Sequence, residues 1–201
     1  MLVYKLTDEN NRTYNNTQWG EGVTHTASGR GEMCGPGWIH FYTDPLLAVL
    51  LNPIHADFYN PNCWEAEAVI EINNHGLKFG TTKLTTLRRI ELPEISLEQK
   101  VKFGILCALA VHREPGFVNW ANAWLDGKDR LASAADAAYR AAAYAGTDFN
   151  WDNPVDADVA KTEWYAAAAA AAATISMSNR AVNDVATIDL VSIARKAIEG
   201  N

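Results

Sequence analysis

Hydrophobic positions in the first half of the chain mostly follow the two-residue period of β-strands. In the segment 64–72, WEAEAVIEI, apolar positions alternate with mostly acidic ones, which predicts a half-buried strand. The inward positions would be Trp64, Ala66, Ala68, Ile70 and Ile72. Shorter apolar or β-branched segments predict further strands at 1–6, 12–17, 77–79 and 87–92. The sequence Asn-Asn-His-Gly at 73–76 predicts a tight turn, and the glycine-rich segment 18–37 an open loop.

The stretch 34–53 contains a turn, a strand and a capped helix within a short length. It opens with Cys-Gly-Pro-Gly and continues through six aromatic or β-branched residues at 38–43. Asp44 and Pro45 then match an N-cap followed by proline at the first helical position. An apolar helix would follow and end at residue 51, because Asn-Pro comes next.

Beyond Pro93 the hydrophobic period changes to that of helices. Ser96 and Gln99 match a capping box, at the start of a helix that is apolar nearly all round and therefore central. A second, amphipathic helix follows, with apolar residues at Phe117, Trp120, Ala121, Trp124 and Leu125. Further helices are expected over 130–145, 154–177 and 180–198. The pattern predicts an α+β fold, with a β-rich half at 1–93 and a helical half at 94–201.

Two of the expected helices are rich in alanine, and 166–173 are eight consecutive alanines. Alanine favours helix but buries little surface, so such helices gain stability only through close packing. Most of the buried area would come from Tyr139, Tyr144, Trp164 and Tyr165. The packing partner is either the neighbouring helix or a second copy of the chain. A homo-oligomer formed through 129–177 is therefore one expectation.

Composition narrows the class of protein. The formal net charge of −7 argues against a general nucleic-acid binder, which needs a basic surface. Three cysteines without a CxxC spacing indicate reduced thiols, and we expect Cys34 to be a buried, inert thiol. The first ten residues do not match a signal peptide, and the apolar run at 165–173 is too short to span a bilayer. We expect a soluble, cytoplasmic protein that does not bind membranes.

Four histidines fall in the β-rich half, at His25, His40, His55 and His75. Neutral imidazole is a common metal ligand, but these spacings match no ligand pattern. The glycines of 18–37 lack the lysine and the strand-to-helix context of a phosphate loop, and no Gly-x-Ser-x-Gly elbow is present. We expect no metal and no cofactor, with His40 a hydrogen-bonded core or pocket residue.

Two stretches resemble a known family. The first is a glycine turn followed by GWIHFYTDP and an apolar helix. The second combines SLEQKVKFGILCAL, FVNWANAWLDGKDR and an alanine-rich tail. Together they resemble an uncharacterised family of small phage and prophage proteins. The resemblance implies an accessory role in the cytoplasm of an infected cell, such as counter-defence or host takeover, and no catalysis.

A shorter stretch resembles one element of ADP-ribosyltransferases, a strand of the form G-x-x-x-Y-T followed by an Asp/Pro-started helix. The resemblance implies that Tyr42 stacks on nicotinamide and that Glu67 or Glu71 is the glutamate of a later strand. The first strand of that family presents Arg or His followed by a small residue. The chain has only Val-Tyr-Lys-Leu at 3–6.

Three functions follow as hypotheses. The favoured one is a non-catalytic accessory protein that binds a host protein or a small nucleotide-like ligand. Its ligand surface would lie in 18–43 and use Trp19, His25, Arg30, Trp38, His40 and Tyr42, since aromatic rings and a guanidinium suit stacking and anion pairing. The alternatives are an NAD-dependent transferase built on Tyr42 with Glu67 or Glu71, and an oligomeric structural protein.

Overall fold

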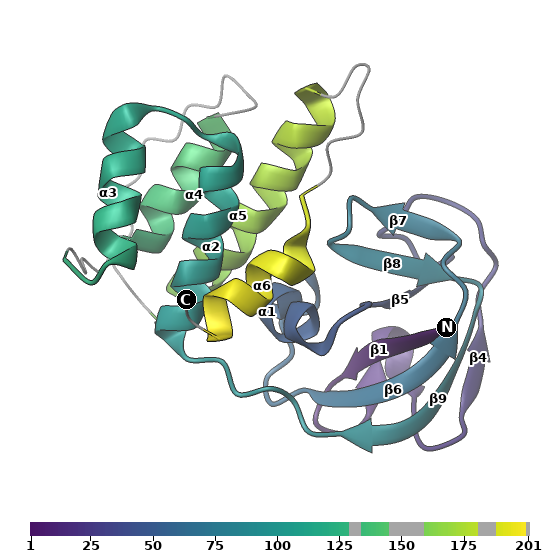
Figure 1. The fold of residues 1–201 in the computed structure, drawn as a ribbon. Helices are drawn as coiled ribbons and strands as arrows, with labels where there is room; N and C mark the ends of the chain where they lie inside the picture. The colour runs from purple at the N-terminus through teal and green to yellow at the C-terminus, as the bar shows by residue number, and fades with distance from the viewer. Residues whose placement is uncertain (129–133, 145–158, 181–187, 200–201) are drawn as a thin grey trace. The chain divides into compact units, whose positions relative to one another are not determined.

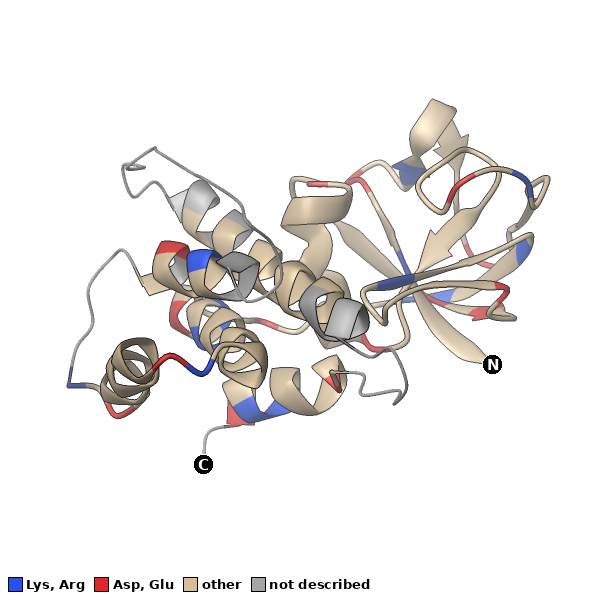
Figure 2. Ribbon diagram, turned by 90° about the horizontal axis from the view of Figure 1, so that it is seen from above, with Lys and Arg blue, Asp and Glu red and all other residues tan. Residues whose placement is uncertain are grey.

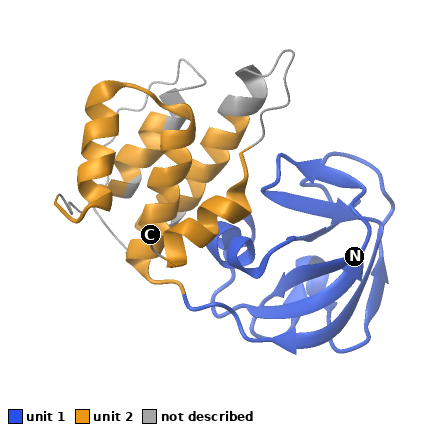
Figure 3. Cartoon of the chain, in the orientation of Figure 1, with its two compact units in different colours: residues 1–94 blue, residues 95–201 orange. Residues whose placement is uncertain are grey.

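The computed structural model describes residues 1–128, 134–144, 159–180 and 188–199. The chain divides into two units, 1–94 and 95–201, one residue from the boundary that the sequence predicts (Figure 3). The first unit consists mainly of strands with one α-helix, and the second is helical (Figure 1). The predicted α+β class is confirmed. Among the described helices, none is long and apolar enough to cross a bilayer.

The strands of the N-terminal unit form two larger antiparallel sheets. The four-stranded sheet has the order β1-β6-β9-β4, with bounds Leu2–Thr7, Asn62–Ala68, Lys83–Ile90 and Thr24–Thr26. The three-stranded sheet has the order β5-β8-β7, with bounds Ile39–Phe41, Lys78–Thr81 and Ile72–Asn74. Tyr4 on β1 and Tyr42 just beyond β5 exchange two backbone hydrogen bonds of 2.8 Å. This isolated bridge joins the two sheets.

One hydrophobic core fills the space that these strands enclose. Its buried members come from both sheets and from the loop before β4: Val3, Trp19, Ile39, Phe41, Ala66, Ala68, Phe79 and Leu84. The rings of Phe41 and Phe79, which are cross-strand partners, stack with centroids 6.0 Å apart. Alternate residues of β5 and β8 therefore face this core, and the residues between them face the other side of the three-stranded sheet.

Several strand predictions hold only in part. Strand β6 buries Trp64, Ala66 and Ala68 as predicted, but it ends there, and Ile70 is 38% exposed. At this end of β6 the Met1 amino group donates to the Ala68 carbonyl at 2.9 Å. The predicted turn is confirmed, with His75 and Gly76 both at positive φ.

The segment 12–17 is not one strand. It contains β2, Arg12–Thr13, and a 3-10 turn, Tyr14–Asn16, before β3, Thr17–Gln18. The turn forms because Asn15 adopts a left-handed backbone, which asparagine tolerates. The predicted open loop 18–37 contributes β4, whose Thr24–Thr26 pair with β9.

Helix α1, Pro45–His55, begins as predicted and ends later. The Asp44 carboxylate accepts the Leu46 N–H at 2.9 Å, which confirms the N-cap. The predicted stop at residue 51 is wrong, because the helix continues through Pro53. Asn52 holds the last turn in place, since its side chain accepts the Phe58 N–H and donates to the Phe58 carbonyl.

The helical unit is arranged around α2, Leu97–Val111, which packs on each of the other described helices of the unit. Those helices are α3, Pro115–Leu125, α4, Ala134–Tyr144, α5, Val159–Arg180, and α6, Leu190–Glu199. The predicted capping box is present, with the Gln99 N–H on the Ser96 hydroxyl and the Gln99 side chain on the Ser96 N–H. The predicted central position of this helix is therefore confirmed.

The alanine-rich helices pack on each other and on α2. On α5 the alanines at 166–170 and 173 are buried, and Tyr139 of α4 contacts Tyr165 with ring centroids 5.5 Å apart. A Cβ built on Gly104 of α2 would lie 3.0 Å from the Ala166 backbone, so these two helices approach closely. The side chains of Tyr144 and Trp164 lie outside the described part of the structure.

Candidate functional site

Four polar side chains lie on the face of the three-stranded sheet that points away from the hydrophobic core, and at the end of the adjoining helix. Ile39 and Phe41 point into the core, so His40 and Tyr42 lie on the opposite face. Phe79 also points into the core, which places Lys78 on the same opposite face. The β5–β8 register pairs Phe41 with Phe79, and one further step brings Tyr42 opposite Lys78. With His55 from the end of α1, we call this set, His40, Tyr42, His55 and Lys78, the basic face.

Tyr42 and His55 are hydrogen-bonded partners. The phenol oxygen lies 2.9 Å from His55 Nδ1, and the ring centroids are 5.8 Å apart. Burial raises the pKa of the Tyr42 phenol, so the phenol keeps its proton at neutral pH. Burial, followed by the positive charge of Lys78 and by His40, lowers the pKa of His55 to about 3. The phenol therefore donates to Nδ1 of a neutral His55, whose own proton lies on Nε2.

His40 is fixed by the loop that precedes β5. Its Nε2 is hydrogen-bonded to the Met33 carbonyl, and since a carbonyl only accepts, Nε2 carries the proton. Burial lowers the pKa of His40, the bond to Met33 opposes this, and the charges of Lys78 and Lys5 lower the pKa further. At neutral pH His40 is thus a neutral N–H donor close to two cations.

Lys5 supplies the second cation from inside the four-stranded sheet. Its Nζ donates to the His40 carbonyl at 2.8 Å and lies 5.3 Å from the centre of the Trp19 ring. The carbonyl can accept this bond because β1 and β5 are joined only through the Tyr4–Tyr42 bridge. Burial lowers the pKa of Lys5 to about 8.

Lys78 is the least compensated charge of the site. Its residue is only 9% exposed, and within the described chain its ammonium makes no hydrogen bond or ion pair. No carboxylate contributes to the pKa shifts of His40, His55 or Lys5. The arrangement is one of positive charge and N–H donors, which suits an anion.

The remaining predicted ligand residues lie in other surroundings. Trp19 is 3% exposed and belongs to the core, where its Nε1 donates to the Thr13 hydroxyl at 2.9 Å. The ring of His25 packs edge-on against it at 4.6 Å, and His25 Nε2 bonds the Gln18 carbonyl. Trp19 is therefore packed between the core, His25 and Lys5, and it is not available for a ligand to stack on.

Arg30, Trp38 and Cys34 lie on or beside the loop that bonds His40. Arg30 is exposed, and Trp38 is half-buried with its Nε1 donating to the Gly31 carbonyl at 3.1 Å. Cys34 is exposed, so the expectation of a buried thiol is wrong there. The loop turns its backbone toward the sheet and this side chain toward solvent. Cys63 and Cys107 are the buried thiols.

The residues of the transferase hypothesis make other contacts. The Glu71 carboxylate accepts the N–H and the hydroxyl of Thr82, and these bonds lower the Glu71 pKa. Glu67 is exposed on β6, opposite Leu2 and Thr85. The charged side chain that the register brings beside Tyr42 is the cation Lys78. The transferase reaction needs a glutamate that stabilises a developing positive charge, whereas β8 places a lysine next to this tyrosine.

Sequence reasoning found His40 and Tyr42 but missed the lysines and His55 as their neighbours. A usable signal exists for Lys78, because it alternates with the apolar Phe79 directly after the predicted turn. Lys5 is two residues from Val3, so the period of a strand places it on the same face as this apolar residue. The contact with His55 depends on α1 continuing past the predicted stop, so no sequence pattern indicates it.

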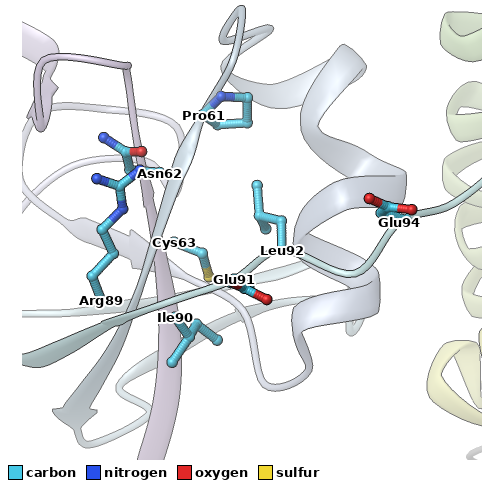
Figure 4. Close-up of a pocket in the computed structure, with 8 residues that line it drawn as sticks. All are labelled: Pro61, Asn62, Cys63, Arg89, Ile90, Glu91, Leu92 and Glu94. Carbon is cyan, nitrogen blue, oxygen red and sulfur yellow. The ribbon is translucent and has the colours of Figure 1, made fainter.

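A separate pocket of about 730 Å³ lies where β6 begins and β9 ends (Figure 4). It is lined by Pro61, Asn62, Cys63, Arg89, Ile90, Glu91, Leu92 and Glu94. Arg89 and Asn62 lie on one side of it and Glu94 on the other. The Asn62 amide already donates to Asp8, Glu9 and Asn11, and burial raises the pKa of the Cys63 thiol to about 12. The pocket therefore offers neither a reactive thiol nor a free amide, and we regard the basic face as the stronger candidate.

In the part of the chain that the structure describes, no group of three or more His, Cys, Asp or Glu side chains is placed so that it could hold a metal ion. Lys and Arg positions are interspersed with Asp and Glu along the described elements (Figure 2). Comparisons of the chain with protein-family models, with curated proteins and with solved structures found no match in any of the three.

Proposed function

We propose that the N-terminal unit binds a small phosphate-bearing, nucleotide-like ligand at the basic face and catalyses no reaction on it. The observation that carries the proposal is Lys78, whose residue is 9% exposed and whose ammonium has neither a hydrogen bond nor an ion pair among the described residues. Packing of the side-chain stem holds this ammonium in place, and without a partner of its own it stays available to an anion.

The neighbours of Lys78 favour phosphate over a simple carboxylate. The His40 and His55 rings are neutral at pH 7 and provide N–H donors beside the ammonium, while Lys5 adds a second positive charge. Phosphate presents several anionic oxygens that can accept from separate donors at once. A carboxylate has only two oxygens and would leave part of this set unused.

The biological setting of the proposal comes from the sequence. The GWIHFYTDP stretch that resembles small phage proteins includes His40 and Tyr42 of the basic face. We therefore propose an accessory role in an infected cell, in which the protein captures a nucleotide-like molecule in the host cytoplasm. A host protein that presents a phosphate would engage the same groups.

Calorimetric titration with pyrophosphate, ADP and NAD at constant ionic strength tests the proposal. The variant Lys78→Met keeps the length of the side chain and removes the charge, and Lys83→Met does the same at an exposed position of β9. We expect Lys78→Met to weaken pyrophosphate binding about tenfold or more, as the loss of a charge-assisted contact predicts. Lys83→Met should bind like the parent protein.

Two results would overturn the proposal. One is the absence of binding to all three probes, and the other is unchanged affinity in Lys78→Met. The NAD titration also separates the two classes of function, because a transferase or hydrolase would release nicotinamide. Release that disappears in Tyr42→Phe would replace the binding proposal with the enzymatic one.

A further inference from the structure

The segment 29–37 forms a closed loop over the basic face, and we call it the strap. Its neck is held by the Gly29 N–H, which donates to the Gly37 carbonyl at 2.9 Å. Gly37 also packs directly on the backbone of Arg30, where an added Cβ would lie 1.8 Å from the carbonyl oxygen. Because that neighbour is backbone, only glycine fits this position while the neck stays closed.

The strap is fastened to the sheet at two points. The Met33 carbonyl accepts the His40 Nε2–H, and the Gly31 carbonyl accepts the Trp38 Nε1–H at 3.1 Å. Between these points the Met33 sulfur lies 3.6 Å from the place of a Cβ on Gly80, the cross-strand partner of His40. The strap thus covers the part of the basic face where β5 and β8 pair.

The Met33 carbonyl is a neutral oxygen bonded to a donor that is exposed to two positive charges, those of Lys78 and Lys5. A hydrogen bond from the same N–H to an anionic oxygen is about twice as strong as one to a neutral acceptor. Both fastening bonds join neutral groups, so a charged ligand that offers His40 a stronger acceptor can replace the bond to Met33.

We infer that the Met33 carbonyl occupies the place of a ligand oxygen on His40, and that the strap lifts when a phosphate-bearing ligand binds. This inference rests on the proposed function and adds the way in which its site opens. A ligand that binds only the open state has its apparent affinity reduced by the fraction of open molecules. Loosening the neck should therefore strengthen binding without changing any group that contacts the ligand.

Trypsin provides a direct readout of strap opening, because Arg30 is exposed within the strap and is followed by Gly31. We expect pyrophosphate to accelerate cleavage after Arg30, measured by mass spectrometry of the intact protein and its fragments. Gly37→Ala cannot keep the neck closed, so it should raise the cleavage rate without ligand and tighten pyrophosphate binding by about threefold or more. Gly20→Ala is the matched control, since its added methyl meets only the Val23 side chain at 3.5 Å.

Pro36→Gly is the second variant, because it loosens the exposed strap without adding atoms. It should shift both readouts in the same direction as Gly37→Ala. If pyrophosphate binds but leaves cleavage after Arg30 unchanged, or protects it, the strap does not lift and the inference fails while the binding proposal survives. If pyrophosphate does not bind the parent protein or either strap variant, the binding proposal itself fails.

Discussion

Lys5 is the residue whose energetics depart most from those of an ordinary lysine. Burial lowers its pKa from 10.5 to about 8. Between these two values the unfolded chain holds a proton that the folded chain has lost, so the free energy of unfolding rises with pH. Relative to Lys5→Met, the parent protein should gain about 3 kcal/mol of stability between pH 7 and pH 10.5, since each pKa unit corresponds to 1.36 kcal/mol.

Urea unfolding of both proteins at a series of pH values measures this difference, and groups that titrate in both proteins cancel. The control is Lys83→Met, which removes an exposed ammonium from the same unit and leaves Lys5 in place. A constant difference for Lys5→Met would mean that its ammonium is compensated in the folded protein.

At the same scale, the sequence identifies polar groups more readily than their environments. Alternation in 38–43 places His40 and Tyr42 on one face, and this part of the site is predictable. Lys5 and Lys78 were missed because lysine is rarely buried, so a pattern assigns it to solvent. Trp19 was assigned to the ligand surface because a loop aromatic has no period from which its burial could be inferred.

At the scale of elements, starts are more predictable than ends. Asp44 and Ser96 cap their helices through a local hydrogen bond that the sequence specifies within three residues. The end of α1 depends on the Asn52 amide holding Phe58, a contact that no pattern marks. The Glu114 carboxylate likewise caps α3 by accepting the Gly116 and Phe117 N–H groups.

Helix α2 offers a test of packing against intrinsic propensity. In an isolated helix, Gly→Ala stabilises by about 1 kcal/mol. At Gly104 the added methyl would lie 3.0 Å from the backbone of Ala166, so α5 would have to move away. We expect Gly104→Ala to destabilise the helical unit by about 1–3 kcal/mol, the usual effect of overpacking.

The matched variant is Ala110→Gly on the same helix, which should destabilise by about 1 kcal/mol through propensity alone. Both substitutions thus lower the midpoint of urea unfolding, although propensity predicts opposite signs for them. An increase in stability for Gly104→Ala would show that α2 and α5 are not in close contact.

For the whole molecule, the sequence predicted the fold class but not the sheet topology. The change of hydrophobic period near Pro93 specifies where strands give way to helices, because period is a local property. The pairing of β1 with β6 joins residues that are about sixty positions apart, such as Val3 and Ala66. Periodicity says which face of a strand is buried but carries no information about its partner.

The oligomeric state depends on what the alanine-rich helices pack against. A homo-oligomer through 129–177 was expected if these small faces had no partner within the chain. In the described residues they do have one, since the alanines at 166–170 and 173 are buried and Ala166 meets Gly104. Close packing of this kind leaves the described faces no need of a second copy.

We therefore expect the 201-residue chain to sediment as a monomer at micromolar concentration, with a mass near 22.1 kDa. Gly104→Ala provides the internal check, because forcing α2 and α5 apart would expose alanine surface and promote self-association. A dimer in the parent protein that Gly104→Ala leaves unchanged would place the interface elsewhere, and the exposed apolar residues Met1, Leu2, Val69 and Ile70 would be the first to test.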